Sequence, residues 1–231
     1  MILRAARRDE AAVRAQARAF LGALGIAALA LPGAWPGSRG VPDPVALLVW
    51  LACCAPAAGA LAGGARLPAW PFAAAIPGAW AILFALVAAL APRDLATPAY
   101  AVLAAAGLFA SGYAVGRLLR PEQACVAAAS LFLASTALVL APLAGGWLRA
   151  PWPGPISGLL LDLSPATLLA ECAGLDWLRH PAVYDAAGAA DLDPRLRAPY
   201  RPELAGGLAL VMGCGLAYLA ARIVRRSASA P

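Results

Sequence analysis

The sequence predicts an all-α membrane protein with six transmembrane helices, both termini in the cytoplasm, and an extracytoplasmic helical loop between the fifth and sixth spans. Three observations predict this fold. The chain is 62% hydrophobic and 13% charged, whereas a soluble domain has roughly 25% charged residues. Apolar runs long enough to cross a bilayer recur along the chain. Arginine is concentrated in the segments that this topology places on one side of the membrane.

The basic residues indicate where the protein resides. All eighteen are Arg, and Ala, Gly and Pro are abundant, a combination typical of a GC-rich bacterial genome. The sequence therefore predicts a multi-pass protein of the bacterial cytoplasmic (inner) membrane. The five cysteines show neither the short paired spacing of a metal site nor a disulfide framework. We expect them to be free thiols packed as small apolar side chains.

Residues 1–18 are predicted to form a cytoplasmic amphipathic interfacial helix. At about 100° per residue, the arginines of this segment fall within an arc of roughly 120° on a helix. They are Arg4, Arg7, Arg8, Arg14 and Arg18. One interpretation is a helix that lies on anionic membrane lipid or contacts a partner protein. The other is a plain arginine cluster that only fixes the orientation of the first span.

Residues 19–231 are predicted to form a single six-helix domain. The first run is short and follows a basic segment, so a signal peptide is an alternative. We expect an uncleaved span, because the charged segment is long, includes Asp9 and Glu10, and is followed by no A-x-A cleavage site. The six predicted spans cover residues 20–31, 45–63, 70–91, 98–116, 124–145 and 204–221.

Several small or helix-breaking residues fall inside these spans. Pro56 and Pro77 each remove a helix hydrogen bond and are expected to kink the second and third spans. The fourth span ends in a GxxxG pattern formed by Gly112 and Gly116. This pattern lets two helix backbones approach closely.

The charge balance predicts the orientation of the spans. With both termini inside, the inner segments hold eleven Arg and three acids, and the outer segments hold seven Arg and nine acids. The positive-inside rule is therefore met by an even number of spans. The long loop of residues 147–203 is then extracytoplasmic.

The first part of that loop is rich in proline. Pro151, Pro153 and Pro155 predict that the chain leaves the membrane without forming a helix. The apolar run at 156–163 is too short to span a bilayer.

A helix is predicted next. Ser164 is a good N-cap residue and Pro165 suits the first helical turn. The helix is expected to run to about Arg179, because Pro181 would stop it. Its apolar side predicts a helix that lies flat on the outer leaflet or dips into it.

Chemical groups at membrane depth are missing from the sequence. None of the predicted spans contains Asp, Glu, Arg or His, which disfavours an ion-coupled carrier. The sequence contains neither a GxxxxGK[ST] nucleotide loop nor an HExxH zinc motif. We therefore expect no enzymatic activity, cofactor, metal or nucleic-acid partner for this chain.

One pair of loop residues nevertheless has the spacing of an acid–base pair. Asp176 and His180 are four residues apart and Glu171 precedes them, so the pair could share one face of a helix. Such a pair could act as a general base or contribute to a metal site. The alternative, which we favour, is a solvated polar face.

A short segment resembles a known family. The residues from Leu161 to Glu171 read LDLSPATLLAE and follow a fifth span that ends near Pro142. They resemble the L-S/N-P-…-E segment between the fifth and sixth spans of permeases of type-2 ATP-binding-cassette exporters. The resemblance implies a permease subunit that dimerises and moves a substrate with a separate ATPase chain. It also implies functional roles for Ser164, Pro165 and Glu171.

The sequence departs from this family after the second span. Those permeases usually carry a long cytoplasmic segment there, but here the joint is only residues 64–69. The resemblance then implies ATPase contact through residues 1–18 and through Arg117 and Arg120. Two alternatives remain. The Ala- and Gly-rich spans would suit a structural or assembly subunit of a larger membrane complex, and Asp176 with His180 would suit an outer-leaflet enzyme.

Overall fold

The structure is a computed structural model that describes residues 44–65, 98–147, 154–175 and 201–229. All regular secondary structure in these ranges is α-helical. The helices are α2 (Pro44–Gly64), α4 (Pro98–Leu118), α5 (Pro121–Trp147), α6 (Gly154–Leu163), α7 (Pro165–Cys172) and α9 (Pro202–Ser229).

Proline marks the start of these helices. Five of them begin at a proline, and α6 has Pro155 as its second residue. Proline suits this position because its φ is already helical and its missing N–H would have no partner inside the helix. The prolines within the helices, Pro56 in α2 and Pro142 in α5, do not end them.

Three described helices are long and apolar enough to cross a membrane. The apolar stretches are Ala99–Leu118, Pro121–Ala144 and Pro202–Ser227, which coincide with the predicted fourth, fifth and sixth spans. Helix α2 occupies the predicted second span, with a shorter apolar stretch at Leu48–Gly64. The predicted first and third spans and the interfacial helix of residues 1–18 lie outside the described residues.

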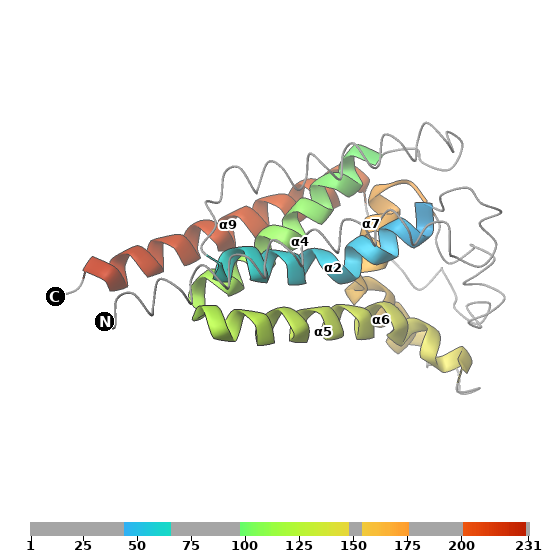
Figure 1. Cartoon of the computed structure of the whole chain (residues 1–231). Helices are drawn as coiled ribbons and strands as arrows, with labels where there is room; N and C mark the ends of the chain where they lie inside the picture. Colours follow the sequence, from blue (N-terminus) through green and yellow to red (C-terminus); the bar gives the residue numbers. More distant parts are fainter. Residues whose placement is uncertain (1–43, 66–97, 148–153, 176–200, 230–231) are drawn as a thin grey trace.

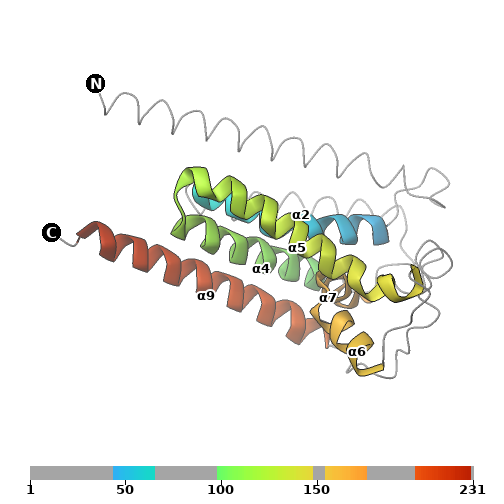
Figure 2. The same cartoon turned by 90° about the horizontal axis from the view of Figure 1, so that it is seen from below.

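The long helices pack in the order α9, α4, α2, α5 (Figures 1 and 2). Helix α4 contacts both α9 and α2, and α2 contacts α5. The central position of α4 shows in its burial, because 56% of its apolar stretch is buried, against 22% for α5 and 17% for α9. The two outer helices therefore present wide apolar surfaces away from this bundle.

The helices run in a defined pattern of directions. Helices α2 and α4 run parallel, because Gly112 lies against Pro56 and Gly116, four residues later, lies against Ala60. Helix α9 also runs parallel to α4, whereas α5 runs the opposite way along α2 (Figure 1). Of the four long helices, α2, α4 and α9 therefore start at one end of the bundle, and α5 starts at the other.

Glycines bring α2 and α4 into backbone contact. A methyl group on Gly112 would collide with the Pro56 carbonyl, and one on Gly59 would collide with the Phe109 carbonyl. The predicted GxxxG pattern is therefore used, and it faces a second one formed by Gly59 and Gly63 on α2. Such packing replaces bulky side chains with close backbone contact.

A second glycine contact joins α4 to α9 on another side of α4. Gly107 meets Ala209 of α9, and Gly213 of α9 meets Gly107 in turn. Gly206 approaches Tyr100 about two turns nearer the helix starts. Helix α4 is thus held between two neighbours through positions without side chains.

The start of the long loop differs from the prediction. The prolines around residue 155 were expected to exclude helix, yet α6 begins at Gly154 and runs to Leu163. The prediction was wrong at Pro155, because proline is incompatible with a helix interior but not with its first turn. Pro151 and Pro153 lie outside the described residues.

The predicted extent of the next helix was also wrong, because α7 ends at Cys172 and not near Arg179. Gly174 has a φ of 74°, a conformation that glycine adopts without a steric penalty. The N–H of Leu175 donates to the Ala170 carbonyl at 2.8 Å, and that of Gly174 donates to the Glu171 carbonyl at 3.0 Å. These two bonds form a Schellman motif, which terminates the helix.

Candidate functional site

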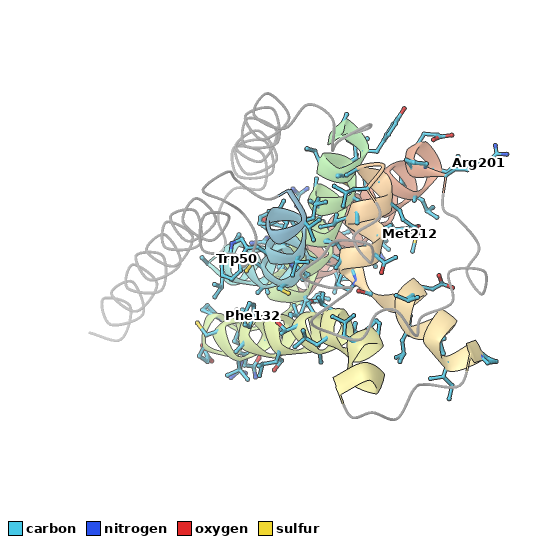
Figure 3. The ribbon with its side chains drawn as sticks, turned by 90° about the vertical axis from the view of Figure 1, so that its right-hand side faces the viewer. Trp50, Phe132, Arg201 and Met212 are labelled. Atoms are coloured by element: carbon cyan, nitrogen blue, oxygen red, sulfur yellow. The ribbon has the colours of Figure 1, made fainter. Side chains whose placement is uncertain are left out.

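Helix α7 is built into one end of the bundle. It packs against α2, α4, α5 and α9, and it lies across their ends when the molecule is seen from that side (Figure 3). Six of its eight residues are buried. The expectation of a helix on the outer leaflet is therefore corrected, because α7 is an internal helix that closes the bundle.

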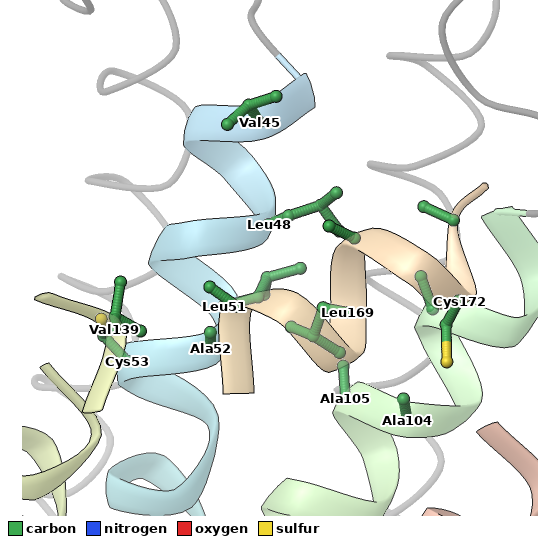
Figure 4. Close-up of a cluster of buried hydrophobic side chains, with 14 of the residues drawn as sticks. Val45, Leu48, Leu51, Ala52, Cys53, Ala104, Ala105, Val139, Leu169 and Cys172 are labelled. Atoms are coloured by element: carbon green, nitrogen blue, oxygen red, sulfur yellow. The ribbon is translucent and has the colours of Figure 1, made fainter. Parts of the chain in front are cut away.

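Apolar packing holds α7 in place. Leu169 is 0% exposed and lies between Leu51 of α2 and Ala105 of α4 (Figure 4). Cys172 belongs to the same core cluster, as does Leu161 at the end of α6. Burying an aliphatic side chain of this size stabilises a fold by about 1.5–3 kcal/mol. The buried side chains of α7 therefore hold it in the bundle.

Ser164 occupies the break between α6 and α7. Its backbone is extended (φ −73°, ψ 120°), and its carbonyl accepts the Leu168 N–H at 3.2 Å. It is therefore the N-cap residue, as predicted, but its side chain does not cap the helix. The Oγ atom is buried, and it has no hydrogen-bond partner in the described part of the chain. A buried hydroxyl of this kind costs about 1–3 kcal/mol.

Two further polar side chains lie on α7. Thr167 is fully buried, three residues after Ser164. Glu171 is half-buried, with its Oε2 atom shielded from solvent. Helix α7 therefore carries hydroxyl and carboxylate groups into the end of a largely apolar bundle.

Cys172 connects α7 to the start of α9. Its Sγ lies 3.8 Å from the carbonyl oxygen of Pro202, in position for a weak S–H donor bond. Burial raises the pKa of the Cys172 thiol to about 11, because an apolar environment disfavours the charged thiolate. Cys172 is therefore a buried, neutral thiol that packs as a small apolar residue, as the sequence predicted.

The other cysteines only partly follow the expectation. All five are thiols outside any disulfide, and Cys53 and Cys54 are buried. Cys125 on α5 and Cys214 on α9 are instead exposed on the outward faces of these helices, because the apolar surface of a spanning helix faces away from the bundle as well as into it.

The predicted outer residues have different outcomes. Ser164, Pro165 and Glu171 lie together on one short helix at the end of the bundle. Asp176 and His180 lie outside the described residues, and the helix expected to carry them ends before both. In the described ranges, His, Cys, Asp and Glu form no group of three that could hold a metal ion.

The opposite end of the bundle carries the predicted basic residues Arg117 and Arg120. Arg120 caps α5, because its carbonyl accepts the N–H groups of Gln123 and Ala124. Gln123 Oε1 in turn accepts the Arg120 N–H at 3.3 Å, an arrangement like the capping box. Arg120 is exposed and Arg117 is half-buried. The N-terminal candidates lie outside the described residues; they are Arg4, Arg7, Arg8, Arg14 and Arg18.

The sequence placed Thr167 and Cys172 on one predicted helix, but it did not show that this helix lies inside the bundle. Their apolar neighbours suggested an amphipathic surface helix, and a pattern of periodicity does not say what covers the apolar face. The available signal was Gly174, a residue suited to the C′ position. It limits the helix to eight residues, too few to cover much leaflet surface.

Comparison with known protein families, with curated proteins and with solved structures finds no match to this chain.

Proposed function

We propose that this chain is a permease-like membrane subunit of an ATP-binding-cassette exporter, with six spans, both termini in the cytoplasm of a bacterium, and energy supplied by a separate ATPase. One observation carries the proposal. The segment that resembles such permeases, Ser164 to Glu171, forms a buried helix that contacts α2, α4, α5 and α9. A substrate that leaves through this end of the bundle would have to pass α7.

The directions of the helices support six spans. Helix α2 ends at the end of the bundle opposite to the start of α4, since the two run parallel. A further crossing between them is expected, and the apolar run at 70–91 in the sequence is long enough for it. Helix α5 ends and α9 starts at the same end of the bundle (Figure 1), as the two helices that flank an extracytoplasmic loop would.

The charges of the described residues support the orientation. The end at which α4 and α9 finish carries one acid, Glu122, and five arginines, which are Arg117, Arg120, Arg222, Arg225 and Arg226. The end with α7 carries one arginine, Arg201, and three acids, which are Asp162, Glu171 and Glu203. By the positive-inside rule, the arginine-rich end is cytoplasmic.

The side chains of the described spans support an external energy source. Between Ala99 and Gly116, and between Ala124 and Ala144, the described spans contain no Asp, Glu, Arg or His. Ion-coupled carriers use such groups at membrane depth, so we assign the energy to an ATPase that contacts the cytoplasmic end near Arg120. The proposed complex contains two copies of this chain, as the resemblance implies.

Purification of the native protein in a mild detergent tests this function, with identification of the proteins that copurify. We expect an ATPase subunit in a fixed ratio, and its loss in the variant R117Q/R120Q while R201Q retains it. Recovery of the chain without any ATPase would remove the permease proposal.

A second candidate is a structural subunit of a larger membrane complex. The glycine contacts on both sides of α4 favour it, because they make a rigid bundle with little room for movement between α2, α4 and α9. The same purification separates the two functions. A structural subunit would copurify with other multi-pass chains and without ATPase.

A further inference from the structure

The last turns of α9 extend past the other described helices. Figures 1 and 2 both show this end of α9 beyond the ends of α2, α4 and α5. The helix has 28 residues and is therefore about 42 Å long, whereas the hydrocarbon core of a bilayer is about 30 Å thick. Part of α9 must lie in the headgroup region.

The sequence of α9 determines which part that is. Its uncharged stretch, residues 204–221, has a length of about 27 Å. This stretch matches the hydrocarbon core, so Arg222 and the residues after it reach the headgroups. The helix continues without a break to Ser229, and the Ser227 hydroxyl donates to the Ile223 carbonyl at 3.1 Å.

The basic side chains of this end point to one side of α9. At about 100° per residue, Tyr218, Arg222, Arg225 and Arg226 fall within an arc of roughly 100°. Tyr218 is 65% exposed, and both Arg222 and Arg225 are exposed. Tyrosine one turn before exposed arginines is the arrangement found at membrane–water boundaries.

We infer that Arg222 and Arg225 form a binding site for the phosphodiester group of an anionic phospholipid in the cytoplasmic leaflet. The guanidinium groups match the charge and the planar hydrogen-bond geometry of phosphate oxygens. Among the described residues of this end, Glu122 at the start of α5 is the only carboxylate, so little negative charge competes with the lipid. The inference rests on the proposed membrane orientation but not on the ATPase.

Titration of lipids into the detergent-solubilised full chain tests this site, with native mass spectrometry to count bound lipid. Phosphatidylglycerol and phosphatidylcholine serve as the anionic and zwitterionic probes. We expect the wild type to bind phosphatidylglycerol more tightly. The variant R222Q/R225Q should weaken that binding at least fivefold, about the effect of losing one arginine near an anionic surface, with phosphatidylcholine binding unchanged. R222K/R225K should weaken that binding less than R222Q/R225Q does, because lysine keeps the charge but not the planar geometry.

The matched control is R201Q, which removes an exposed arginine at the opposite end of the bundle. It should bind both lipids as the wild type does, and circular dichroism should give all variants the same helix content. An unchanged phosphatidylglycerol affinity in R222Q/R225Q, or an equal loss in R201Q, would overturn the site. Displacement of the lipid by millimolar inorganic phosphate would assign the site to a soluble phosphate and overturn the inference of a lipid site. Because this titration uses the chain purified free of any partner subunit, its results stand apart from the copurification test.

Discussion

Gly112 and Gly215 are both helix glycines, but only Gly112 touches another helix. A methyl group on Gly112 would meet the Pro56 backbone, whereas one on Gly215 would meet no atom within 4 Å. We expect Gly112→Ala to lower the free energy of unfolding by about 1–3 kcal/mol through overpacking. Gly215→Ala should leave it unchanged or raise it by up to about 1 kcal/mol, since alanine favours helix. Thermal unfolding in detergent measures both, and equal effects would refute the close packing of α2 on α4.

The reactivity of Cys172 should depend on pH. Its pKa of about 11 keeps the thiol neutral when an unfolded thiol, with a pKa of 9.0, is half ionised. In a variant with the other four cysteines replaced by Ala, alkylation at pH 9 should be roughly fiftyfold slower in the folded protein than in dodecyl sulfate. The stability gained by burying the neutral thiol is present below pH 9 and is lost as the pH rises through 11. Equal rates in both states would place Cys172 in solvent.

Some properties of single residues follow directly from the sequence, and others do not. The GxxxG pattern of Gly112 and Gly116 and the N-cap position of Ser164 both follow from local geometry that the residue types dictate. The burial of the Ser164 hydroxyl, which caps no backbone N–H, does not follow from the sequence. It depends on helices that are distant in the sequence and cover it.

At the scale of elements, α7 distinguishes an internal helix from a surface one. Leu169 on α7 is 0% exposed, and Leu159 on α6 is 58% exposed. We expect Leu169→Ala to cost about 2–5 kcal/mol of unfolding free energy, and Leu159→Ala to change it by about 0.5 kcal/mol. Denaturant titration of both variants in the same detergent measures the difference. Similar costs would mean that α7 lies on the surface of the bundle.

The limits of the long helices could be predicted from sequence, but those of the short ones could not. Helices α4, α5 and α9 begin and end within about eight residues of the predicted spans, because long apolar runs and flanking arginines are strong signals. Helices α6 and α7 depend instead on a proline in the first turn and on Gly174 after the last one. Each of these signals is a single residue, and Pro181 predicted a later end for α7.

At the scale of the whole molecule, the arrangement of helices explains how the two ends differ. Parallel α2, α4 and α9 place every described helix start except that of α5 at the end closed by α7 (Figure 1). Five of the six arginines in the described ranges lie at the other end. A bilayer with its cytoplasmic face at the arginine-rich end accommodates both features. Which helices lie side by side could not be predicted, because all the spans are similar in composition.

Cysteine labelling of intact cells tests the central claim, that the chain crosses the membrane with α7 at the outer end. Each variant carries one cysteine in a background without the five native ones. A membrane-impermeant maleimide should label Ile156→Cys at the start of α6 from outside the cell. It should label Gln123→Cys and Ser227→Cys, both exposed at the arginine-rich end, only after the membrane is opened. Labelling of Ile156→Cys and Gln123→Cys from the same side would contradict the proposed topology and the exit past α7 that depends on it.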